Sequence, residues 1–147
     1  MNELENCFKR NQLRKVESST KKAELSIKQA KEWLIEAEKN LENGTCKSAQ
    51  ISTYLAFFHS ARAVLFRDGI REKSHYCIGV YLEKYVDNGD LEEEYTLIFD
   101  RMRSARNTDQ YSFQTPPSIQ EVKSGIQAAK KFIERIRKLL KNTIPPK

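Results

Sequence analysis

The chain has 147 residues, enough for one domain with a continuous core. Hydrophobic residues make up 39% of it and charged residues 31%, which is the composition of a globular protein. With only 5 glycines and 4 prolines, turns are scarce, which favours long helices over a disordered chain or one with many strands. No apolar run is long enough to span a membrane and the first residues do not resemble a signal peptide, so we expect no membrane segment and a cytoplasmic location.

The formal net charge of +6 is placed at one end of the chain. Residues 118–147 contain 8 basic and 2 acidic side chains, which accounts for the whole excess. Such a basic segment attracts polyanions, but lysines on a terminal helix also serve as an ordinary solvated face. We take the solvated face as the default and an RNA-backbone track as the alternative.

The cysteines and histidines do not indicate a metal or disulfide framework. Cys7, Cys46 and Cys77 are odd in number, widely spaced and without a CxxC motif. This spacing predicts reduced thiols with neither a disulfide nor a zinc site. His59 and His75 lie far apart in sequence without an acidic cluster beside them, so we expect no metal ion and no cofactor.

The first part of the chain predicts an appendage followed by a helix. Leu4, Phe8 and Val16 could line a short helix or arm over residues 1–17. Apolar residues then recur every three or four positions over residues 23–41, which predicts a helix closed by Asn43-Gly44. We expect a helical bundle over residues 18–142 and a tail over residues 143–147.

The middle of the chain predicts a central helix and a short one. Residues 47–68 are apolar on more than one side, which is typical of a helix packed against several neighbours, and Gly69 ends this helix. A shorter helix is expected over residues 75–86, followed by a turn at residues 87–90.

Two further helices complete the expected fold. Asp90 and Glu93 have the spacing of a capping box for a helix that runs to residue 111, and Ser118 with Glu121 forms another for a helix over residues 119–140. No alternating pattern indicates a strand longer than a few residues. The sequence therefore predicts an all-α, up-and-down bundle of four long helices and one short helix.

Several segments, in order, resemble the HEPN family, the higher-eukaryote and prokaryote nucleotide-binding domain. They are residues 54–65, Gly69, residues 73–75, the helix ending at residues 106–111, and the basic last helix. The resemblance covers about residues 20–140. It implies a bundle that forms homodimers through its arginine helices. In members with an arginine followed four to six residues later by a histidine, it implies metal-independent cleavage of RNA.

Residue by residue, the resemblance also shows a departure from the nuclease motif. Arg106 matches the motif arginine and Asn107 the polar residue beside it, but Tyr111 stands where the histidine would be. The pattern is closer to a subgroup whose motif ends in Asp-Tyr, although Gln110 occupies the aspartate position and Asp109 lies one residue early. The resemblance assigns a catalytic role to Arg106 and Tyr111. Tyr111 is a poor general base at its ordinary pKa near 10.

Arginines on a half-buried helix face commonly bind carboxylates or phosphates. We therefore expect Arg103, Arg106 and Asn107 to contact a phosphate, with intramolecular pairing of the arginines to Asp100, Asp109 or Glu93 as the alternative.

The central helix contributes two more candidates, His59 and Arg62, three residues apart. His59 is interpreted as a hydrogen-bonded core histidine or as a substitute acid and base beside the arginine helix. His75, which follows a serine, is interpreted as a helix-start residue.

The resemblance thus implies an RNA- or nucleotide-binding protein of toxin–antitoxin type, which would cleave RNA if the altered motif is active. It also implies two partners: a second copy of the chain, for which we expect Tyr111 and Phe113 near the two-fold axis, and a nucleotidyltransferase antitoxin. The alternative is a catalytically inactive module that only binds this nucleotidyltransferase.

Overall fold

The computed structural model describes the backbone of residues 2–111 and 116–146, and the side chains of these residues except 106–111. Six helices and two short strands occur in this part of the chain. In order they are α1 Glu3–Lys9, β1 Leu13–Lys15, α2 Thr20–Glu42, α3 Cys46–Asp68, β2 Ile70–Glu72, α4 His75–Asp87, α5 Glu93–Tyr111 and α6 Ile119–Asn142. The all-α prediction is confirmed, and the four long helices and the short α4 are those expected.

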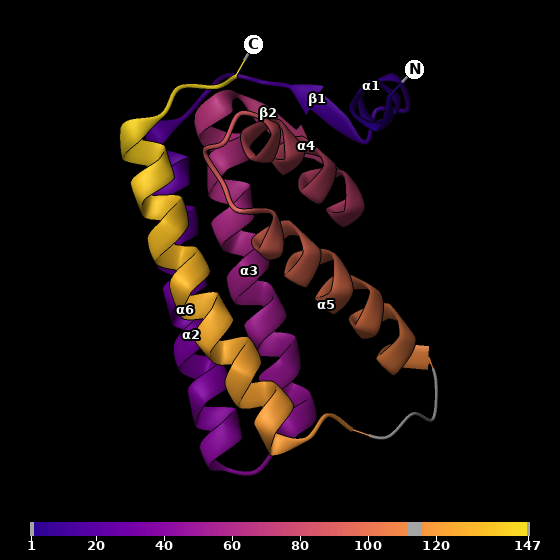
Figure 1. The fold of residues 1–147 in the computed structure, drawn as a ribbon, viewed down its shortest axis with the longest axis vertical. Coiled ribbons are helices and arrows are strands. Elements are labelled where there is room, and N and C mark those ends of the chain that lie inside the picture. Colours follow the sequence, from indigo (N-terminus) through magenta and orange to yellow (C-terminus); the bar gives the residue numbers. More distant parts are fainter. Residues whose placement is uncertain (1, 112–115, 147) are drawn as a thin grey trace.

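Helix α3 is the centre of the molecule. Figure 1 shows α2 and α6 running beside it along its whole length, with α4 and α5 on its other side. Buried residues occupy most of the circumference of α3, including Tyr54, Ala56, Phe57 and Ala63. Phe57 stacks on Phe132 of α6, with ring centroids 4.9 Å apart. An apolar circumference, rather than one stripe, is what allows α3 to contact both layers.

The N-terminal segment forms more than an arm. Helix α1 is followed by β1, which pairs with β2 in an antiparallel ladder that aligns Leu13 with Glu72 and Lys15 with Ile70. Val16, expected on the face of a short helix, instead follows the strand and is 40% exposed. The strands are three residues each, too short for an alternating pattern to identify them.

The prediction of three reduced thiols was wrong for two of the cysteines. Cys7 of α1 and Cys77 of α4 form a disulfide, with Cα atoms 5.9 Å apart, and Cys46 is free. The two residues are separated by 70 positions in the chain. They meet only because α1 packs on α4, so sequence spacing carries no signal for the bond.

The capping predictions had different outcomes. The box at Ser118 and Glu121 is confirmed, with both hydrogen bonds present. The one at Asp90 was wrong, because α5 begins at Glu93 and the Asp90 carboxylate accepts a hydrogen bond from Asn88 at 2.6 Å instead. Local spacing cannot distinguish a cap from a turn in which the acid bonds to a neighbouring amide.

A buried polar network joins the ends of α3 and α6. The Asp68 carboxylate, fully buried, accepts hydrogen bonds from Tyr81 and Tyr85 at 2.8 and 2.5 Å and pairs with Arg67 at 2.9 Å. Arg67 also donates to the main-chain oxygens of Leu140 and Thr143. Burial and this carboxylate raise the pKa of both tyrosines. Arg67 therefore caps the C-terminus of α6, whose carbonyls have no partners within the helix.

Within the described residues, none of the helices has both the length and the apolar character required to cross a lipid bilayer.

Candidate functional site

An aromatic and histidine cluster lies where α3, α4 and α5 meet. We call Tyr54, Phe58, His59 and His75 the histidine cluster. His75 stacks on Phe58 with ring centroids 4.3 Å apart, and His59 packs edge-on against Phe58 at 4.9 Å. The Tyr54 hydroxyl and Nδ1 of His75 form a hydrogen bond of 2.7 Å. One aromatic ring thus separates the two histidines, which the sequence places 16 residues apart.

The cluster is attached to α5 through Tyr54. Tyr54 is 1% exposed and stacks on Phe99 of α5 with ring centroids 5.5 Å apart. Phe58 is also buried, whereas His59 and His75 are only partly buried. The histidines are therefore held by packed rings and still reach solvent, which a proton-transfer group requires.

The environment of His59 keeps its imidazole neutral. Burial lowers the pKa of His59 from its ordinary value, and the positive charge of Arg62 and the proximity of His75 lower it further. Neither interpretation made from the sequence describes it fully: the ring is only partly buried, and it lies beside charged and aromatic groups. A neutral imidazole at neutral pH can accept a proton.

Arg62 is engaged inside the molecule. Its Nε lies 2.6 Å from Oε1 of Glu72 on β2, with side chains 19% and 6% exposed. The guanidinium also lies over the rings of Phe58 and Phe66, at 5.5 and 4.9 Å. The second oxygen of Glu72 is buried and has no hydrogen-bond partner among the described residues. Burial lowers the pKa of Arg62, and the paired carboxylate opposes this shift.

Arg103 shows the intramolecular pairing that the sequence left open. Its guanidinium bonds to Asp100, three residues earlier, at 2.8 Å, and lies 5.4 Å from the ring of Tyr76 on α4. The Arg103 side chain is 22% exposed and that of Asp100 is 59% exposed. An ion pair this exposed contributes only about 0–1 kcal/mol, so another anion can compete with Asp100.

A groove beside this ion pair has the wrong charge for a phosphate. It measures about 580 Å³ and is lined by Tyr76, Asp100 and the carboxylates of Glu3, Glu83 and Asp87, with one lysine, Lys84. Tyr76 donates a hydrogen bond to Glu3 at 3.0 Å, and this bond raises the pKa of its hydroxyl. An anion would therefore have to reach Arg103 from outside this groove.

The remaining predicted site residues lie outside the described side chains. They are Arg106, Asn107 and Tyr111, and Phe113 lies outside the described residues altogether. The backbone of α5 is helical through Tyr111, which places Arg106 three residues beyond Arg103 on the same helix face.

Two residues of this region were missed as site candidates. His75 and Tyr76 begin α4 behind the N-cap Ser74, and they connect the histidine cluster to Arg103. The interpretation of His75 as a helix-start residue is confirmed, but its stacking on Phe58 was not foreseen. The one available signal was the position of residues 73–75 in the family resemblance, since no local pattern relates this helix start to residue 58 or residue 103.

The family model described as HEPN domain matches residues 23–139, most of the chain. The chain belongs to the HEPN domain family.

Two relatives extend the match. A protein of Methanocaldococcus jannaschii with the name "Putative toxin" is 32% identical over 122 residues, covering 80% of this chain and 88% of the relative. A UPF0332 protein of Thermotoga maritima is 27% identical over 116 residues, covering 78% of this chain and 88% of the relative. The similarity thus spans 88% of the length of each relative, and the name of the first describes that relative as a toxin.

Proposed function

We propose that this HEPN protein is the toxin of a toxin–antitoxin pair and binds RNA or nucleotide phosphates through the arginine face of α5, formed by Arg103 and Arg106. The observation that carries the proposal is the placement of Arg103, partly exposed on α5 and lying over Tyr76, in a family with a toxin-named relative. Asn107, next to Arg106 in sequence, is proposed to add a hydrogen bond to the same phosphate.

Phosphate binding by this face is supported by its chemistry. A guanidinium forms two parallel hydrogen bonds to a phosphate, stronger than those between neutral groups. The partner that Arg103 would give up, Asp100, lies on the surface three residues away and holds it weakly. Arg62, by contrast, is paired with a buried carboxylate. We therefore assign Arg62 a supporting role, in which its charge adds to the effect of burial in lowering the pKa of His59.

We extend the proposal to cleavage of RNA without a metal ion. The reaction needs a base for the 2′-hydroxyl proton, a cation for the phosphate and an acid for the leaving 5′-oxygen. His59, neutral at pH 7, is proposed as the base. Arg106 supplies the cation, and Tyr111, protonated at neutral pH, is proposed to donate the proton to the leaving oxygen.

The experiment that tests this proposal measures binding and cleavage of a labelled single-stranded RNA in the presence of a chelator. Arg106→Ala is expected to weaken binding about tenfold or more, since a charge-assisted hydrogen bond contributes roughly 1.5–3 kcal/mol. Arg103→Ala is expected to weaken it less, and His59→Gln to reduce cleavage without reducing binding.

Arg101→Ala is the matched control, because Arg101 is an exposed arginine of the same helix two residues from Arg103 and therefore on another face. If Arg101→Ala weakens RNA binding as much as Arg106→Ala does, RNA binding depends on the total charge of the protein and not on the arginine face. If the wild-type protein binds no RNA or nucleotide, the proposal is wrong.

We also propose that the protein is a homodimer with Tyr111 and Phe113 near its two-fold axis, so that two arginine faces share one groove. The expected mass in light scattering at micromolar concentration is twice that of one chain. Tyr111→Asp combined with Phe113→Asp is expected to give monomers, because carboxylates in an apolar contact are costly to bury. A monomeric wild-type protein would contradict this arrangement.

A second candidate function is an inactive module that binds a nucleotidyltransferase. The observation that favours it is the absence of the motif histidine, since Tyr111 and Gln110 replace the residues expected there. Its test is a binding assay with a nucleotidyltransferase encoded beside this gene. A tight complex, together with no cleavage of RNA by the isolated protein under any condition, would favour this candidate over the ribonuclease.

A further inference from the structure

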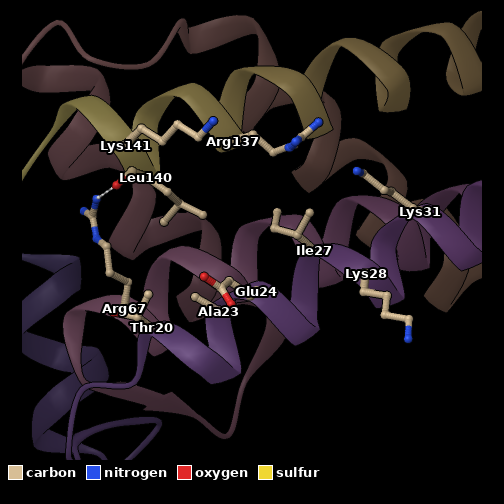
Figure 2. Close-up of a pocket in the computed structure, with 10 residues that line it drawn as sticks. All are labelled: Thr20, Ala23, Glu24, Ile27, Lys28, Lys31, Arg67, Arg137, Leu140 and Lys141. Atoms are coloured by element: carbon tan, nitrogen blue, oxygen red, sulfur yellow. Dashed lines mark hydrogen bonds between the residues drawn. The ribbon is translucent and has the colours of Figure 1, made fainter.

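A second concave surface lies between α2 and α6, on the side of α3 away from α4 and α5. It is a groove of about 430 Å³ lined by side chains of α2, α6 and the end of α3, among them Ala23, Ile27, Arg67 and Leu140. Figure 2 shows Ile27 and Leu140 facing each other across its middle. We call this surface the α2–α6 groove.

The groove is strongly basic. Its lining contains five cations and a single acid, Glu24. Within the part of the chain that the structure describes, no ion pair involves Lys28, Lys31 or Lys141. Arg137 is held only by Glu134, three residues away, in a pair whose side chains are 41% and 61% exposed. Four of the five cations are thus available to an anionic partner.

The fifth cation has a different role. Arg67 is hydrogen-bonded to the last carbonyls of α6 and to Asp68, and it closes one end of the groove (Figure 2). The groove wall at this end is therefore fixed by a buried network rather than by surface contacts. A preformed wall lowers the ordering cost of binding.

The floor of the groove is aliphatic. It is formed by Ala23 and Ile27, 3% and 8% exposed, and by the half-buried Leu140. None of the described residues that line the groove is aromatic. Proteins that hold single-stranded nucleic acid commonly stack its bases on aromatic rings, so this floor is unsuited to bases. It is suited to aliphatic side chains.

The walls are two antiparallel helices. Thr20, at the start of α2, and Lys141, at the end of α6, lie at one end of the groove, whereas Lys31 and Arg137 lie toward the other (Figure 2). The cations are spaced three and four residues apart on their helices, which places them in rows along both walls. Such a groove matches a helix that carries an aliphatic stripe flanked by carboxylates.

We propose that the α2–α6 groove is a docking site for an acidic amphipathic helix of a partner protein. Its aliphatic side chains pack on Ile27 and Leu140, and its carboxylates pair with Lys31, Arg137 and Lys141. This surface is separate from the arginine face of α5 and does not depend on RNA binding there.

The test uses the full chain and a fluorescein-labelled helical peptide of about 14 residues, the length at which isolated helices become marginally stable. The peptide has leucines on one face and glutamates on both flanks. A second peptide replaces each glutamate by lysine, and a third replaces each leucine by serine. We expect measurable binding of the first peptide, at least tenfold weaker binding of the third, and none of the second.

Charge reversal locates the site. Lys31→Glu combined with Arg137→Glu is expected to weaken binding of the acidic peptide about tenfold or more, because two attractions become repulsions. Lys123→Glu combined with Lys131→Glu is the matched control. Both of these lysines are exposed on α6 and neither lines the groove, so the same change in net charge should alter binding by less than about threefold. Circular dichroism melts verify that all variants fold.

Four outcomes would overturn the proposal, three of them measured with the peptides and one with RNA. The acidic peptide does not bind, the two double variants weaken binding equally, or the serine peptide binds as well as the leucine peptide. The fourth outcome is that single-stranded RNA displaces the peptide and that the Lys31→Glu and Arg137→Glu double variant no longer binds this RNA. This result would assign the groove to nucleic acid instead. Arg106→Ala is expected to leave peptide binding unchanged, which separates this result from the failure of RNA binding at α5.

Discussion

At the scale of single residues, the site depends on groups whose contacts come partly from other elements. His59 shares α3 with Arg62, but Phe58, which the His59 ring contacts edge-on, stacks on His75 of α4. Glu72, which holds Arg62, belongs to β2. The sequence identified His59 and Arg62 as candidates by residue type and spacing, and it could not identify the partners that decide what each does.

The lowered pKa of His59 predicts a pH dependence of stability. The unfolded chain has an ordinary histidine pKa of about 6.5, whereas burial, Arg62 and His75 lower the pKa in the folded protein. Between the two values the unfolded state binds more protons, so the free energy of unfolding falls as pH drops below about 6.5. Urea denaturation at pH 7.5 and 5.5 measures this loss.

His59→Gln is the comparison for this experiment, because it cannot titrate in that range. We expect the variant to lose less stability than the wild type between the two pH values, while His75 and the carboxylates contribute equally to both proteins. Equal losses would show that His59 has the same pKa in the folded and unfolded states.

At the scale of elements, helix ends were the features most directly encoded. The expected helix over residues 47–68 is α3 Cys46–Asp68, and the expected end at Gly69 is a left-handed residue with φ of +75°. The capping box predicted at Ser118 and Glu121 is likewise present at the start of α6. The failure at Asp90 marks the limit of such signals, since a turn and a cap use the same residue types.

Gly69 also approaches another segment, which gives a prediction at this scale. A Cβ atom at Gly69 would lie 2.7 Å from the main-chain oxygen of Val16, whereas one at Gly44, with φ of +77°, would meet nothing within 4 Å. Gly44→Ala is expected to cost about 1 kcal/mol of unfolding free energy for the left-handed backbone alone. Gly69→Ala is expected to cost roughly 2 kcal/mol or more, because the chain before α2 must also move.

Chemical denaturation of the two glycine variants measures the difference. Similar losses of stability in Gly44→Ala and Gly69→Ala would mean that the segment around Val16 moves away at no cost. A larger loss at Gly69 would establish that the β1–β2 ladder is packed against the end of α3 as the structure places it.

At the scale of the whole molecule, the disulfide is the covalent link between the N-terminal segment and the bundle. Cys7 and Cys77 are 70 residues apart, and closing a loop of this length in the unfolded chain is worth about 4 kcal/mol by the entropy model. We expect a reducing agent to lower Tm clearly, and Cys7→Ser to lower it to a similar extent.

Cys46→Ser is the control for this measurement, since Cys46 is free and only partly buried. Its Tm should stay close to that of the wild type and should remain sensitive to the reducing agent. A wild-type Tm that does not change on reduction would show that the link contributes nothing to stability.

The sequence by itself determined the four long helices and α4, most of their ends, the central position of α3 and the HEPN class, because apolar periodicity, caps and motif order are properties of neighbouring residues. Only the tertiary structure decided the pairing of Cys7 with Cys77, the β1–β2 ladder, the histidine cluster and the α2–α6 groove. Each of these joins residues of separate elements, and their meeting depends on how the helices pack against one another. That packing is set by the summed burial of many side chains, and no short segment of the chain records it.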